Sequence, residues 1–251
     1  MSDDSERNRR GSASISGAGN IGGGDYERVS ISGAGKVTGD ITADEIKISG
    51  SGKIQGLARA VRVTTSGAAV FEAGIIADEL RISGSTRSHG VAEVKELKCS
   101  GVFKTDGSLT SEYVKVSGSL AVGGDVSSEI FKTTGAFRIG GLLSADHIEI
   151  NLAGRCEARE IGGERIEVRR GGWHQRGLIL DGLIRIFTGS STSLLQCQVI
   201  EGDAVHLEDT EADVVRGKRI VIGPGCDIKT VEYSEELSVD EDAKVGKERK
   251  T

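Results

Sequence analysis

The chain has 251 residues and a formal net charge of −6. This acidic balance disfavours nucleic acid as a general partner. No apolar stretch is suited to a signal peptide or approaches the length of a membrane span, so we expect a soluble, cytoplasmic protein without a membrane span. Glycine occurs 37 times, which disfavours long helices because each glycine weakens a helix by about 1 kcal/mol.

The chain begins with polar and charged residues, and we expect residues 1–13 to form a disordered tail. An imperfect first coil follows, because Ile15 and the two residues after it anticipate the sequence at Ile31, one residue out of register. The segment from Gly22 to Asp25 is interpreted as a corner. Its motif does not recur every nine residues, as in calcium-binding solenoids, and no phosphate-loop lysine follows it.

From residue 29 onward the sequence repeats with a fixed period. One glycine column holds Gly33, Gly50, Gly67, Gly84, Gly101, Gly118 and Gly135. One apolar column holds Val29, Ile46, Val63, Leu80, Leu97, Val114, Phe131 and Ile148. A period of about 17 residues indicates a solenoid, in which each repeat stacks on the next.

Within one repeat, apolar residues alternate in three short pairs, which is the pattern of β-strands rather than of helices. Glycine or a polar residue separates the pairs and marks the corners. The sequence therefore predicts an all-β, single-stranded parallel β-helix with about 17 residues and three short strands per coil. Its inward columns are narrow and aliphatic, which accounts for the 4% aromatic content. We expect the regular part to span residues 14–152.

Four cysteines occur, at positions 99, 156, 197 and 226, without a CxxC pair. Cys99 and Cys156 fall in inward columns. We therefore expect small buried hydrophobic side chains in a reducing compartment rather than metal ligands or disulfides.

The outward columns carry ordered charge. One basic column contains Lys47, Arg81, Lys98, Lys115 and Lys132. An acidic corner column contains Asp44, Asp78, Glu112, Glu129 and Asp146, and we expect it to offset part of the repulsion between stacked cations. The basic column has two interpretations, a solvated surface that discourages strand pairing and a stripe that contacts an acidic partner.

After residue 152 the repeat becomes less regular, and we expect residues 153–239 to continue the β-helix. Trp173 interrupts the pattern most strongly, and it either covers an open edge of the core or contacts a partner. Leu237 and Val239 restore the spacing near the C-terminus, one period after Ile220 and Ile222. Residues 240–251 are charged and are predicted to be a frayed tail.

The residues give no catalytic, cofactor-binding or metal-binding set, and we expect a protein that is not an enzyme. No pair of histidines has metal-ligand spacing on one strand, and no Ser-His-Asp arrangement follows from the columns. Two alternatives remain open. A left-handed β-helix acyltransferase would use His174, although its coils are one residue longer than the period seen here. A monomeric adaptor would use the basic column.

The repeated segments 31–41 and 48–56, with their Ile-Ser-Gly and Gly-Lys-Val/Ile motifs, resemble those of the bactofilins, a family of bacterial polymer-forming cytoskeletal proteins. The resemblance covers residues 15–152 best. It implies a right-handed β-helix that polymerises end to end without nucleotide. It also implies a scaffold role in cell shape, envelope organisation or motility, with other bactofilin-like proteins or envelope proteins as further partners.

The terminal coils independently indicate self-association. A terminal coil leaves strand groups and apolar side chains without a neighbour, and neither flank reads as a capping helix. Ile15 and Ile21 lie near one terminus, and Leu237 and Val239 lie near the other. We therefore predict that these four residues join copies of the chain into a homopolymer.

Overall fold

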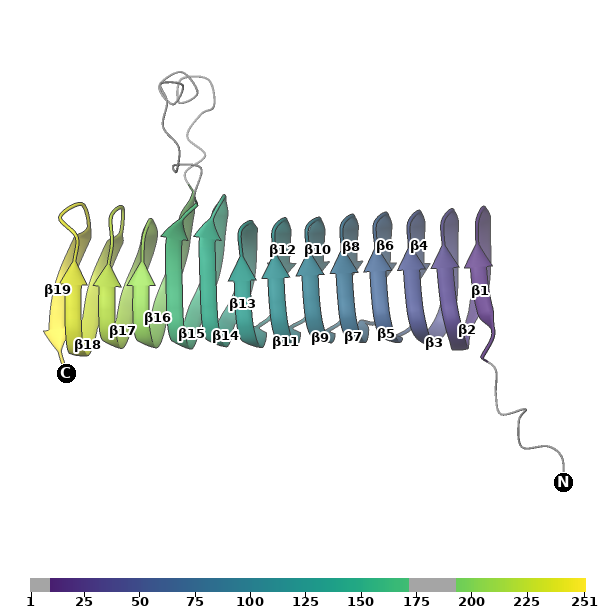
Figure 1. Cartoon of the computed structure of the whole chain (residues 1–251), viewed down its shortest axis with the longest axis horizontal. Coiled ribbons are helices and arrows are strands. Elements are labelled where there is room, and N and C mark those ends of the chain that lie inside the picture. The colour runs from purple at the N-terminus through teal and green to yellow at the C-terminus, as the bar shows by residue number, and fades with distance from the viewer. Residues whose placement is uncertain (1–9, 172–192) are drawn as a thin grey trace, which may run out of the picture. The chain divides into compact units, whose positions relative to one another are not determined.

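The computed structural model describes residues 10–171 and 193–251, and none of them forms a helix. The chain divides into two compact units, unit 1 ending at Tyr113 and unit 2 beginning at Val114. Within each unit, adjacent strands lie side by side as the rungs of a parallel stack (Figure 1). The predicted all-β, parallel β-solenoid is therefore confirmed, and its 17-residue spacing is seen directly in the pairing of the strands of unit 1.

The strands of unit 1 are β1 (Ser12–Ile15), β2 (Ala18–Ile31), β3 (Ala34–Ile48), β4 (Ser51–Ile54), β5 (Ala58–Thr65), β6 (Ala68–Phe71), β7 (Ile75–Ile82), β8 (Ser85–Ser88), β9 (Ala92–Cys99) and β10 (Val102–Thr105). The strand β11 (Leu109–Val116) contains the residue at which the units divide. The strands of unit 2 are β12 (Ser119–Val122), β13 (Val126–Thr133), β14 (Ala136–Leu152), β15 (Arg155–Arg170), β16 (Leu194–Leu207), β17 (Thr210–Ile222), β18 (Asp227–Val239) and β19 (Lys244–Lys250).

Each rung has three faces, which we name by the inward residues of one repeat. Face A holds Val29 and Ile31, face B holds Val37, and face C holds Ile41 and Ala43, all of them buried. In most rungs of unit 1 the strands of faces C and A join. The eight-residue strand β5, for example, follows the four-residue strand β4, so two of the three predicted short strands form one element.

The core of unit 1 is a set of straight inward columns. On face A the pairing register places five apolar residues in line, and all of them are fully buried. They are Val29, Ile46, Val63, Leu80 and Leu97. Burial of such a column removes apolar surface from water along the whole stack, which is the main stabilising contribution. The sequence period therefore predicted the core of this unit correctly.

The serine–glycine corners of unit 1 at Gly33, Gly50, Gly67, Gly84 and Gly101 leave no room for a side chain at glycine. The Gly67 nitrogen donates a hydrogen bond of 3.3 Å to the carbonyl oxygen of Ile48 in the preceding rung, as does the Ser66 nitrogen at 2.9 Å. A Cβ atom added at Gly67 would overlap the carbonyl oxygen of Gly50. The corner glycine is thus required by the close approach of successive backbones.

Unit 2 is also a parallel ladder, but its rungs are of uneven length. Neighbouring side chains on adjacent rungs are 19 residues apart at Arg138 and Glu157 but 15 residues apart at Gln196 and Glu211. Within unit 2, one inward column on the face A strands nevertheless runs through Phe131, Ile148, Ile166, Val205, Ile220 and Leu237. Corners therefore absorb the differences in length while the ladder keeps its pairing.

The cysteines follow the prediction in part. Cys99, Cys156 and Cys226 are buried, Cys197 is half-buried, and all four are free thiols. Burial raises the pKa of Cys197 to about 12 and that of each of the other three to about 11. Such thiols carry almost no thiolate near neutral pH and are poor nucleophiles.

The two predicted tails require correction. Ser12 and Ala13 belong to β1, where they pair with Arg28 and Val29 rather than lying in a disordered segment. At the other terminus, Lys244–Lys250 forms β19 and pairs with β18, so most of the predicted frayed tail is a rung. The charged composition of both segments concealed this, because a strand on an existing ladder is held by backbone hydrogen bonds that any side chain permits.

Candidate assembly edges

The N-terminal edge consists of β1 and residues 18–26 of β2. On face A, β1 lies against the second part of β2, with Ile15 opposite Ile31. Residues 18–26 pair with β3 on one side and with no described strand on the other. Ile15 is buried, with 6% of its surface exposed, whereas Ile21 is only half-buried. The backbone groups on the open side of this edge are available for another strand.

The C-terminal edge consists of β19 and the final residues of β18. The strand β19 pairs with residues 227–233, which form faces B and C of the preceding rung. On face A, Leu237 and Val239 pair with β17 on one side, and no described strand covers them on the other. Leu237 is half-buried and Val239 is 38% exposed, although both stand in columns that are fully buried one rung earlier. Leu237 and Val239 therefore lie on face A, where no described strand covers the edge, whereas β19 covers faces B and C of the same rung.

A turn at 240–243 connects β18 to β19. The Asp242 nitrogen donates a 2.9 Å hydrogen bond to Asp240 Oδ1, and the Ala243 nitrogen donates one of 3.1 Å to the Asp240 carbonyl. The aspartate side chain thus supplies local turn chemistry. Beyond the turn, Val245 stands over Ile228 and extends the apolar column of face B.

On face C a ladder of alternating charge ends at the C-terminal edge. Pairing aligns Glu201, Arg216, Glu232 and Arg249. Arg216 Nη1 lies 3.9 Å from Glu201, Arg216 Nε lies 2.7 Å from Glu232, and Arg249 Nη1 lies 3.4 Å from Glu232. The hydrogen bond from Arg216 lowers the pKa of Glu232 below its ordinary value. The ladder stops on a cation, Arg249.

Beside this ladder, Lys250 Nζ lies 5.9 Å from the ring centroid of Tyr233, within cation–π range. Sequence analysis missed Val245, Arg249 and Lys250 as edge residues. The signal was present, because each of them stands one period after its partner in the preceding rung.

The predicted basic column is largely neutralised in both units. In unit 1, Arg81 contacts Glu79, and Lys98 Nζ lies 2.6 Å from Glu96. In unit 2, Lys132 Nζ lies 2.9 Å from Glu149. The remaining two members, Lys47 and Lys115, have no carboxylate within 4 Å among the described residues.

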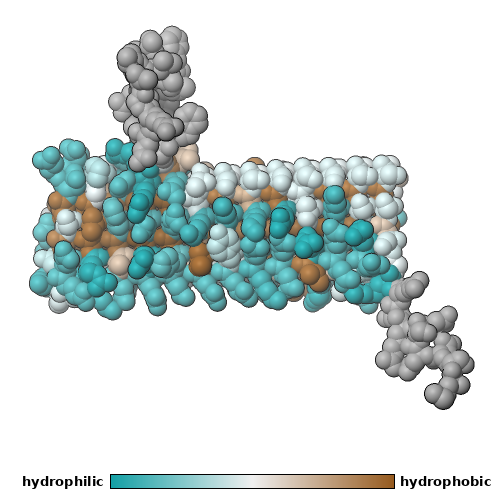
Figure 2. Space-filling view, in the orientation of Figure 1, coloured by the Kyte–Doolittle hydropathy of each residue, from teal (hydrophilic) through white to brown (hydrophobic). Residues whose placement is uncertain are grey.

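Two members of the acidic column pair with cations outside the basic column, Asp78 with Lys95 at 2.8 Å and Asp44 with Arg10 at 2.7 Å. The face seen in Figure 2 is mainly hydrophilic, with hydrophobic residues between the polar ones.

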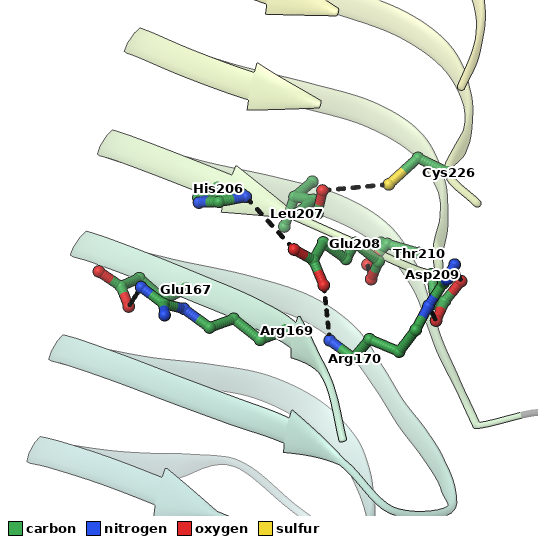
Figure 3. Close-up of polar contacts among 9 residues, drawn as sticks. All are labelled: Glu167, Arg169, Arg170, His206, Leu207, Glu208, Asp209, Thr210 and Cys226. Atoms are coloured by element: carbon green, nitrogen blue, oxygen red, sulfur yellow. Dashed lines mark hydrogen bonds and ion pairs between the residues drawn. The ribbon is translucent and has the colours of Figure 1, made fainter. Parts of the chain in front are cut away.

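An anchored corner marks the place where the described part of unit 2 is interrupted (Figure 3). Arg170 Nε and Nη2 donate hydrogen bonds of 2.6 and 2.7 Å to the two carboxylate oxygens of Asp209. The Arg170 backbone nitrogen donates a further bond of 2.8 Å to Glu208 Oε2. Asp209 adopts a φ of 43°, an uncommon left-handed conformation, and its carboxylate raises the pKa of Arg170. These contacts hold β15 to the loop after β16.

Among the described residues, no group of three or more His, Cys, Asp or Glu residues could hold a metal ion. His89 Nδ1 pairs with Asp106 Oδ2 at 2.7 Å, but both side chains are exposed. A groove of about 800 Å³ runs along unit 2 past Cys197. Two pairs of its charged side chains contact each other, Arg138 with Glu157 at 2.8 Å and Lys229 with Asp213 at 2.6 Å.

Trp173 and His174, the predicted contact residue and the catalytic residue of the acyltransferase alternative, lie outside the described residues. The described residues also contain no helix with the length and hydropathy needed to cross a membrane.

Two curated proteins of Bacillus subtilis (strain 168) are similar to part of this chain, and both carry the description "uncharacterized". The first, YhbF, is 39% identical over 92 residues, which are 37% of this chain and 34% of that protein. The second, YhbE, is 38% identical over 93 residues, which are 37% of this chain and 35% of that protein. The matched part is therefore about a third of each relative. No family model matches the chain, and no solved structure matches it significantly.

Proposed function

We propose that this chain is a non-enzymatic scaffold protein that assembles end to end into filaments without nucleotide. The observation that carries the proposal is that each unit ends in an open strand edge, with Leu237 and Val239 uncovered at one and Ile21 half-buried at the other. Open parallel edges that continue an apolar column bind further strands of the same kind. The resemblance to bactofilins favours the same role, in the cytoplasm of a bacterial cell and in the organisation of its shape, envelope or motility structures.

Electron microscopy of the purified full chain without nucleotide tests the proposal. We expect filaments whose abundance rises with protein concentration. Single particles at every protein and salt concentration would contradict it.

A variant at the edge sharpens this test. Leu237→Arg places a charge at the end of the face A column and should leave short species with an unchanged β-rich circular dichroism spectrum. Val221→Arg is the matched control, because Val221 is a 41% exposed valine one rung earlier whose side chain does not point into the core. Filaments of normal length from Leu237→Arg would show that this edge is not a junction.

A further inference from the structure

The two edges end on different faces, and the difference makes them complementary. At the N-terminal edge, β1 gives face A one strand more than faces B and C. At the C-terminal edge, β19 gives faces B and C one strand more than face A. The strand present in excess at one edge is therefore the strand missing at the other.

We propose that the N-terminal edge of one copy stacks on the C-terminal edge of the next, in the register that the chain uses internally. The strand β1 then covers residues 236–239, and the first part of β2 covers β19. This proposal rests on the proposed function, and it specifies that the filament is polar with a second copy of this chain as the partner at every junction.

The register follows from the columns. The sequence period relates Val29 to Ile148, and the pairing of unit 2 carries that column to Leu237. Since β1 places Ala13 and Ile15 in the columns of Val29 and Ile31, they come to lie over Leu237 and Val239. On face B the same relation places Ile21 over Val245. The junction thus continues three apolar columns and removes the exposed Val239 from water.

On face C the junction continues the charge ladder. Asp25 pairs with Thr42. The sequence period relates Thr42 to Ser144, and the pairing of unit 2 carries the column of Ser144 to Arg249. The series Glu201, Arg216, Glu232 and Arg249 would therefore gain Asp25 of the next copy as its fifth, alternating member. Opposite charges on adjacent strands stabilise the pairing. Asp25 is also the single charged residue between residues 11 and 25.

One of the two neighbouring positions fits as well. Tyr26 comes beside Lys250, which already lies near the Tyr233 ring, so the ammonium group would stand between two aromatic rings. Gly24 comes beside Glu248, which stands over the buried Val231, and this position supplies no partner for that carboxylate. The match of the last rung to the N-terminal edge therefore rests on Asp25 and Tyr26.

Other junctions lack this match. Two C-terminal edges would bring together two copies of β19, each with Lys244, Lys247, Arg249 and Lys250 against the one anion Glu248. Like charges at the strand spacing of about 4.8 Å repel. Two N-terminal edges would leave Leu237 and Val239 uncovered.

Cysteine cross-linking tests the polarity. Ser14 and Ser238 are both exposed, and the proposed register places them opposite one another across the junction. Adjacent strands lie at a distance that a disulfide can bridge. A Ser14→Cys protein mixed with a differently sized Ser238→Cys protein should form mixed disulfide dimers under mild oxidation, at least about tenfold above the wild-type background.

Ser234→Cys in place of Ser238→Cys is the register control, since residue 234 lies four residues earlier, about 13 Å away in an extended strand. It should give no cross-link with Ser14→Cys. Same-variant dimers from Ser14→Cys alone or Ser238→Cys alone would overturn the polar junction.

Charge reversal tests the face C contact. Asp25→Arg and Arg249→Asp should each raise the protein concentration needed for filaments about tenfold at low salt, because each junction then opposes like charges. An equimolar mixture should restore assembly, since copies of the two variants that alternate along the filament oppose unlike charges at every junction. Asp203→Arg is the control, because Asp203 pairs with Lys218 at 2.9 Å away from both edges. Failure of the mixture to restore filaments would overturn this register.

The two hypotheses fail in different ways. Wild-type filaments with same-variant cross-links would leave the proposed function intact and reject the polar junction. Absence of filaments from the wild-type chain would reject the proposed function and the junction with it.

Discussion

Unit 1 and unit 2 are both parallel ladders, but two of their corners leave different amounts of room for a side chain. In unit 1, Gly67 lies so close to the preceding corner that a Cβ atom added there would overlap the carbonyl oxygen of Gly50. In unit 2, at the corner after β14, a Cβ added at Gly154 would meet only the Ala136 side chain, at 3.4 Å. The comparison teaches that single corners differ in the room that they leave, and that partners on adjacent rungs can stand 15 or 19 residues apart in one ladder.

The largest expected effect compares the cores of the two units. Leu80 and Leu195 are both fully buried, one in the regular and one in the irregular stack. If both units depend equally on their inward columns, Leu80→Ala and Leu195→Ala should each lower the free energy of unfolding by about 2–5 kcal/mol. Denaturant titration followed by circular dichroism measures this. A loss below about 1 kcal/mol for Leu195→Ala alone would show that unit 2 is held by other contacts.

The corner glycines give the next effect. Gly67→Ala should lower the free energy of unfolding by about 1–3 kcal/mol, because its Cβ overlaps a backbone oxygen that cannot move away without disturbing the ladder. Gly154→Ala is the matched change in unit 2 and should be neutral or slightly stabilising, since alanine also restricts the unfolded chain. Thermal denaturation of both variants measures the change in stability that each substitution causes. Equal destabilisation would refute the idea that the corners differ.

The smallest effect concerns the anchored corner of unit 2. Arg170→Ala removes a two-bonded contact with Asp209, and we expect a loss of about 1 kcal/mol, because the arginine side chain is half exposed. Arg169→Ala is the control. Arg169 contacts Glu167 at 3.0 Å on its own strand, so its loss should be hardly measurable. Indistinguishable unfolding curves for the two variants would mean that the anchor contributes nothing.

The inward columns were predictable from the sequence because stacking forces like residues to recur at one spacing, as Val29 and Ile46 do. The salt bridges on the surface could not be predicted in this way. The prediction paired the basic column with the neighbouring acidic column. Arg81 and Lys98 instead contact carboxylates two residues earlier, on the same face of their own strands. The Arg170–Asp209 contact spans 39 residues, and no local pattern indicates it.

The edges were predicted in part. Leu237 and Val239 were recognised because they continue apolar columns. The strand β19 was missed because its charge suggested a solvated tail, although Arg249 and Lys250 stand one period after Glu232 and Tyr233. Composition indicates how hydrophilic a segment is, whereas strand pairing depends on the backbone and on the adjacent rung.

The uniform serine–glycine corners of unit 1 also bear on how such a chain could change in evolution. Because each rung contacts only the rungs on either side, duplication of one whole row would insert a new layer without disturbing any existing neighbour. Loss of a single residue inside a row would instead turn that row's buried side chains toward solvent. Genes for a protein of this kind can therefore lengthen or shorten by recombination between rows, while small insertions and deletions are confined to permissive corners such as the one at Gly154.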